Sequence, residues 1–134
     1  MFAGGSDPRE GGFVMRLVAE ILVGLLAALH VYIMVMEMFL WTTPRVRASF
    51  GSTAEFAEAT KVLAANQGLY NGFLAAGLVW ALIASDPVGQ AAKIFFAACV
   101  VVAGLYGAAT ASRRILFAQA LPGAITLAAV LLAG

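Results

Sequence analysis

Apolar residues fill most of the chain in four long stretches that are separated by short polar breaks. The stretches cover approximately residues 17–41, 62–84, 94–111 and 115–133. An α-helix needs about 20 residues to cross roughly 30 Å of hydrocarbon, and each stretch is of that order. The pattern therefore predicts four membrane-spanning helices.

The breaks between the later stretches are short. Asp86-Pro87 and Gly89 interrupt the chain after the second stretch, and a polar turn at residues 112–114 follows the third. Short connections make sequential helices antiparallel neighbours. We therefore predict an all-α fold, an integral membrane four-helix up-and-down bundle.

The segment before the first stretch has a different composition. Residues 1–14 contain repeated glycines and are predicted to form a flexible N-terminal tail, which leaves 15–134 as the transmembrane domain. Met15 directly precedes Arg16 and the first span, so both Met1 and Met15 are candidate start codons. The apolar run of the first stretch is too long for the core of a cleavable signal peptide.

The loop at residues 42–60 is the longest connection. Ser52 stands three residues before Glu55, which is the spacing of a capping box. We expect this pair to begin the second long helix near Thr53.

Composition agrees with a membrane protein. The 134 residues are 63% hydrophobic and only 11% charged, whereas soluble domains have about 45–50% apolar and about 25% charged residues. A net charge of +1 argues against nucleic-acid binding. Cys99 and His30 are the only cysteine and the only histidine, so the sequence predicts no disulfide, metal site or cofactor.

Positive residues favour an orientation with both termini outside. Cytoplasmic loops are enriched in Lys and Arg, so the more basic side of the bundle is predicted to face the cytoplasm. Glu20, four residues after Arg16, is expected to pair with it at the helix end. The more basic side carries Arg45, Arg47, Lys61, Arg113 and Arg114, and the other side carries Arg9, Arg16 and Lys93.

Two sequence motifs resemble a known family. The segments EMFLW at 37–41 and KVLAANQGLYNG at 61–72, together with Gln119 and Pro122, are similar to the domain of unknown function 1304 family. The resemblance extends from about Met15 to the C-terminus. It implies a four-helix bacterial integral membrane protein, with the bacterial cytoplasmic (inner) membrane as the expected location, and no established reaction.

Polar residues within the stretches fall in one half of the predicted bilayer once the helices are antiparallel. Polar groups without partners are costly in lipid, so these residues are predicted to form a buried ligand-binding cluster. The cluster comprises Glu37, His30, Asn66, Gln67, Tyr70, Asn71, Tyr106, Thr110 and Gln119.

Glu37 and His30 are the candidates for a proton donor or acceptor. Their spacing of seven residues places them on one helix face, about 10 Å apart along the axis. Each also has a purely structural interpretation. His30 would then bond a neighbouring helix, and Glu37 would pair with Arg45 or Arg114.

Three functional hypotheses remain open. In the preferred one, the cluster binds a lipid, quinone or isoprenoid, with its headgroup on a basic rim. The alternatives are a proton-coupled small-molecule transporter, which would be oligomeric, and a structural subunit of a larger membrane complex. The expected partners are the lipid bilayer, such a ligand and either further copies or a larger complex. The predicted headgroup rim consists of Arg45, Arg47, Lys61, Arg113 and Arg114.

Overall fold

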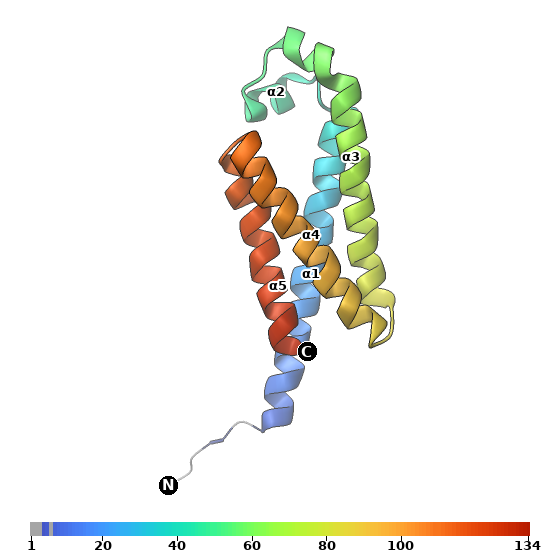
Figure 1. Ribbon diagram of the computed structural model, residues 1–134, viewed down its shortest axis with the longest axis vertical. Helices are drawn as coiled ribbons and strands as arrows, with labels where there is room; N and C mark the ends of the chain where they lie inside the picture. Colours follow the sequence, from blue (N-terminus) through green and yellow to red (C-terminus); the bar gives the residue numbers. More distant parts are fainter. Residues whose placement is uncertain (1–3, 6) are drawn as a thin grey trace. The chain divides into compact units, whose positions relative to one another are not determined.

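A computed structural model describes residues 4–5 and 7–134. All regular secondary structure in this part of the chain is helical (Figure 1). No strand occurs among these residues, which confirms the all-α class. The bundle of four helices stays a prediction, since the helices are more numerous than expected. They are α1 (Pro8–Phe39), α2 (Pro44–Phe50), α3 (Ala54–Ile83), α4 (Val88–Thr110), the π-helix η1 (Leu116–Ala120) and α5 (Leu121–Ala133).

Three helical segments of the described chain are long and apolar enough to cross a membrane. They are Pro8–Phe39, Val88–Thr110 and Leu116–Ala133. Less than half of the most apolar part of each of these helices is buried. Large apolar surfaces are therefore exposed, as expected of helices that contact lipid. The second predicted span, at residues 62–84, falls mostly in α3, and this helix is not among the three segments that are apolar enough to cross a membrane. Its carboxamide residues lower its hydropathy.

The helix α1 begins earlier than the sequence predicts. Pro8 fits the first helical position because that position needs no backbone N–H donor. Asp7 Oδ1 accepts a hydrogen bond from the backbone N of Arg9 at 3.0 Å, which caps the helix start. Residues 8–14 of the predicted flexible tail are therefore helical, and its residues 1–3 and 6 lie outside the described residues.

The connection from α1 to α3 contains the short helix α2. Gly51, with φ 64°, ends α2 in the left-handed conformation that glycine favours, and the backbone N of Ser52 donates to Arg47 O at 3.0 Å. Ser52 thus closes α2 and does not cap α3, so that detail of the capping prediction is wrong. Thr53 Oγ1 accepts from the backbone N of Phe56 at 3.1 Å, and α3 begins at Ala54 as expected.

The chain forms two compact units. We call Ala27–Ala76 the hairpin unit, because it joins the second half of α1 to the first half of α3 through α2. The other unit, called the split unit, combines the residues up to Leu26 with Gly77–Gly134.

In the split unit, α4 lies beside η1 and α5 (Figure 1). Glycines allow the close approach, since a Cβ on Gly104 would lie 2.6 Å from Ala120 Cα and one on Gly123 would lie 2.8 Å from Val100 Cγ1. The π-helical turn ends at Ala120, two residues before Pro122, whose ring cannot fit a regular helix interior.

Candidate functional site

Two residues of the predicted cluster meet in the hairpin unit. Asn71 Nδ2, from α3, donates a hydrogen bond to Glu37 Oε1, from α1, at 2.7 Å. Asn71 is only 8% exposed, and Glu37 is half-buried near the end of α1. A carboxylate placed in an apolar helix is costly unless a donor compensates it, and Asn71 is that donor.

Glycines on α3 bring the two helices of this unit together. A Cβ on Gly68 would lie 2.7 Å from Met38 Cγ, 3.0 Å from Glu37 Cβ and 3.1 Å from Met34 O. A Cβ on Gly72 would lie 2.8 Å from Met34 Sδ. The small-residue spacing in α3 therefore lets the α1 backbone approach, so that Glu37 comes within reach of Asn71.

The second amide hydrogen of Asn71 also has an acceptor. Nδ2 donates to the carbonyl oxygen of Gln67 on its own helix at 3.2 Å. Two acceptors next to one nitrogen fix the orientation of the side-chain amide. The hydrogen-bonding capacity left at the pair consists of lone pairs on Asn71 Oδ1 and on the Glu37 carboxylate, and all of these accept hydrogen bonds.

His30 belongs to the same unit and is completely buried. It lies seven residues before Glu37 on α1, as the sequence indicates. Its roles as a proton carrier and as a helix-packing residue both stay predictions.

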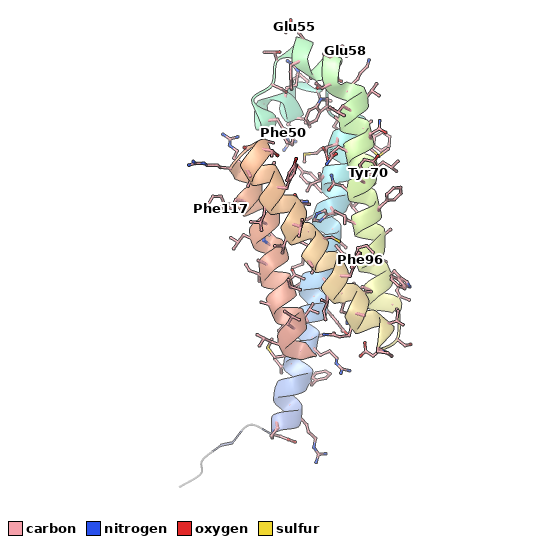
Figure 2. The ribbon with its side chains drawn as sticks, in the orientation of Figure 1. Phe50, Glu55, Glu58, Tyr70, Phe96 and Phe117 are labelled. Carbon is pink, nitrogen blue, oxygen red and sulfur yellow. The ribbon has the colours of Figure 1, made fainter. Side chains whose placement is uncertain are left out.

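The other predicted residues on α3 are exposed. Asn66 is exposed, and its Nδ2 bonds Val62 O on its own helix at 2.8 Å. Gln67 is exposed. Tyr70 is 56% exposed (Figure 2), and its ring lies against Phe73 with a centroid distance of 6.2 Å.

The remaining cluster residues belong to the split unit. Tyr106 is 72% exposed. Thr110 Oγ1 donates to Tyr106 O on the same helix at 2.7 Å, and Gln119 is half-buried within η1. Their assembly with Glu37 and Asn71 into one ligand-binding cluster stays a prediction.

Several residues of the predicted headgroup rim have local partners. Arg47 Nε donates to Thr42 O at 3.2 Å, and Lys61 forms an ion pair with Glu58. Glu58 is labelled near the start of α3 in Figure 2. Arg45 is exposed on α2, and Asn71, rather than Arg45, is the hydrogen-bond partner of Glu37 within the hairpin unit. Arg113 and Arg114 are exposed in the turn before η1.

A second polar site lies in the split unit and contains none of the predicted site residues. An open pocket of about 450 Å³ is lined by residues of α1, α4, the end of α3 and the end of α5, including Arg16, Glu20, Asp86 and Lys93. Glu20 was expected to pair with Arg16, but its ion-pair partner is Lys93, with Nζ and Oε1 3.7 Å apart. Opposite charges at the same ends of the first and third apolar stretches are compatible with this contact, but they do not by themselves show which helices are neighbours.

Within the described part of the chain, no group of three or more His, Cys, Asp and Glu residues could hold a metal ion.

Comparison with known proteins identifies the family. The profile described as Protein of unknown function (DUF1304) matches residues 24–131. The chain is also 31% identical over 105 residues to Uncharacterized protein YpaA of Lactococcus lactis subsp. lactis (strain IL1403), an alignment that covers 76% of this chain and 87% of that relative. No solved structure matches the chain. The resemblance in the sequence motifs is confirmed, and the chain belongs to the DUF1304 family.

Proposed function

We propose that this protein is a multi-pass protein of the bacterial cytoplasmic membrane that binds the polar headgroup of an amphipathic molecule at Glu37 and Asn71. The proposed spans are about 17–41, 62–84, 94–111 and 115–133, with both termini outside. Three strongly apolar helical segments support the membrane location.

The polar side chains of α3 are compatible with its role as the fourth span. Asn71 is buried and bonded to Glu37, and Asn66 bonds a carbonyl of its own helix. A membrane helix tolerates polar groups when protein atoms satisfy them. The lower hydropathy of α3 is therefore consistent with a membrane span.

The observation that carries the proposal is the hydrogen-bond pattern at the pair. Both amide hydrogens of Asn71 are in use, on Glu37 Oε1 and Gln67 O. The atoms left to meet a ligand accept hydrogen bonds, so the site favours a headgroup that donates them. A hydroxyl or an amine fits this requirement, whereas quinone carbonyls only accept and would need a proton on Glu37.

The same geometry is compatible with proton transfer at Glu37. A carboxyl group bonded to a single amide can exchange a proton with a bound hydroxyl or amine. Such transfer would make Glu37 catalytic, or would couple transport to protons, but headgroup binding does not depend on either step.

Native mass spectrometry of the purified full chain tests the proposal with two matched probes. Monooleoylglycerol carries free hydroxyls, and methyl oleate has the same acyl chain without a hydrogen-bond donor. We expect the wild type to retain monooleoylglycerol and not methyl oleate. The variant Glu37→Gln should lose most of this binding, because it replaces the charged acceptor while keeping the side-chain size.

The matched control is Glu55→Gln, which changes an exposed glutamate on the first turn of α3. It should bind monooleoylglycerol like the wild type. Equal retention of both probes, or unchanged binding in Glu37→Gln, would contradict the proposal and leave the pair with a structural role. Proton-driven solute flux abolished by Glu37→Gln in proteoliposomes would favour the transporter alternative.

A further inference from the structure

The pocket in the split unit contains a lysine in an unusual environment. The Lys93 side chain is only 10% exposed, yet its partner Glu20 is 44% exposed. Their charged atoms are 3.7 Å apart, which is too long for a hydrogen bond. Lys93 therefore has a nearby charge but three N–H donors that this pair does not satisfy.

The Lys93 ammonium group is accessible from the pocket. Among the described residues, no buried side-chain nitrogen or oxygen lacks a hydrogen-bond partner. Nζ makes no hydrogen bond to Glu20 at 3.7 Å, and Lys93 lines the pocket. The nitrogen must therefore remain accessible from the pocket, where a ligand or water can accept its protons.

The other charged residues of the pocket make it suitable for an anion. Arg16 contributes a second cation and makes no ion pair within the described chain. Asp86 Oδ1 is engaged, because it accepts from the backbone N of Gln90 at 3.1 Å at the start of α4. Glu20 faces Lys93. Arg16 therefore has a positive charge without an ion-pair partner, and Lys93 keeps N–H donors for an anion beside its ion pair with Glu20. The Glu20 carboxylate disfavours an ion with two negative charges.

A hydrogen bond joins two of the helices that form the pocket walls. Gln90 Nε2 donates to Val130 O at 2.9 Å, which ties the start of α4 to the later part of α5. A pocket whose walls are already fixed loses little conformational freedom when it binds. Its volume of about 450 Å³ fits a headgroup but not the acyl chains of a lipid.

We propose that Lys93 and Arg16 bind the singly charged phosphodiester of a phospholipid headgroup in this pocket. Arg16 precedes the first apolar stretch and Lys93 precedes the third, so both lie where phospholipid headgroups are found. The proposal rests on the membrane location given above, but it does not depend on Glu37.

Dioleoylphosphatidylmethanol is a suitable probe because its headgroup is a phosphodiester without a hydroxyl or amine. It therefore offers no donor to Glu37 and reports on the pocket alone. Its uncharged methyl triester is the matched control. Titration of each into the full chain in detergent, followed by native mass spectrometry, should show binding of the diester at least tenfold tighter than that of the triester.

Variants test the two cations. Lys93→Gln should weaken diester binding about tenfold and Arg16→Gln several-fold, whereas Lys93→Arg should retain most of it. Arg9→Gln, which removes an exposed cation on the same helix outside the pocket, should bind like the wild type.

Glu20→Gln provides a test that does not depend on loss of function. It removes the internal competitor for Lys93, so diester binding should become several-fold tighter. Unchanged or weaker binding in Glu20→Gln, or an unchanged affinity in Lys93→Gln, would overturn the proposal. Displacement of the diester by millimolar inorganic phosphate would also overturn it, because the site would then be one for free phosphate.

Failure of this proposal can be distinguished from failure of the proposed function. Lys93→Gln should leave monooleoylglycerol binding intact, and Glu37→Gln should leave phosphatidylmethanol binding intact. Loss of both ligands in either variant would contradict the existence of two separate sites.

Discussion

Asn71 Nδ2 and Glu37 Oε1 lie 2.7 Å apart, which joins α3 to α1 across 34 positions of the sequence. This contact explains how an apolar helix accommodates a carboxylate. It also makes the two residues energetically dependent on each other, because removal of either takes away a hydrogen bond of the other.

A double-mutant cycle should measure this dependence. We expect Asn71→Ala to lower the free energy of unfolding by about 1–3 kcal/mol, because it removes the donor to a half-buried carboxylate. The coupling with Glu37→Ala should be about 0.6 kcal/mol and at most about 1.7 kcal/mol, as for other hydrogen bonds between membrane helices. Unfolding by titration with dodecyl sulfate in mixed micelles gives these values.

The control for this cycle is Asn66→Ala, whose amide is exposed and bonds its own helix. Its effect should stay within about 0.5 kcal/mol. A coupling energy near zero between the changes at residues 37 and 71 would contradict the role given to the contact.

The glycines of α3 should differ in their tolerance of a methyl group. In Gly68→Ala the new Cβ meets Met34 O and Glu37 Cβ, which are fixed to the α1 backbone. In Gly72→Ala it meets the flexible Met34 thioether. Gly68→Ala should therefore cost about 1–3 kcal/mol of stability, and Gly72→Ala clearly less.

Thermal unfolding in detergent would compare these variants with Gly12→Ala in α1. A Cβ at residue 12 has no neighbouring atom within 4 Å. That control should be neutral, or stabilising by up to about 1 kcal/mol, because alanine favours helix more than glycine. Equal effects at residues 68 and 72 would argue against close packing at Gly68.

The start of α3 predicts a contrast between neighbouring hydroxyl residues. Thr53→Ala removes the acceptor for the backbone N of Phe56 and should cost about 1 kcal/mol. Ser52→Ala should cost less, because Ser52 uses its backbone N to close α2. The free energies of unfolding of the two variants test this prediction. A larger loss of stability in Ser52→Ala would support the capping box predicted from the sequence.

The proposed topology predicts opposite labelling of two serines near helix ends. In a Cys99→Ala background, Ser85→Cys should react with a membrane-impermeant maleimide in intact cells, because its turn is proposed to lie outside. Ser112→Cys should react only after the membrane is permeabilised. The reverse pattern would invert the orientation, and labelling of both residues in intact cells would contradict the antiparallel spans.

Much of the helical structure follows from the sequence because apolar stretches and turn residues are local signals. The breaks at Asp86-Pro87 and at residues 112–114 both separate helices as predicted. The start of α1 was placed too late, since the glycines at 11 and 12 weaken the helix signal while Asp7 and Pro8 provide a good helix start. The short helix α2 was missed because its seven residues give too little periodicity.

The candidate site was predictable only in part. The cost of a carboxylate in an apolar helix identified Glu37, whereas the close approach of the two helices at Gly68 is seen only in the structure. The choice of Asn71 over Asn66 as the partner depends on the rotation of α3 about its axis. The sequence leaves this rotation undetermined, because the polar residues of that helix point in several directions. The Glu20–Lys93 contact depends on which helices are neighbours, so the charges alone could not reveal it.

Retention of a hydroxyl-bearing amphipathic molecule is the most direct measure of the central claim. Native mass spectrometry should find monooleoylglycerol bound to the wild type and to Glu55→Gln, and largely absent from Glu37→Gln. The same occupancy in Glu37→Gln as in the wild type, with both proteins folded, would contradict a headgroup site at Glu37 and Asn71.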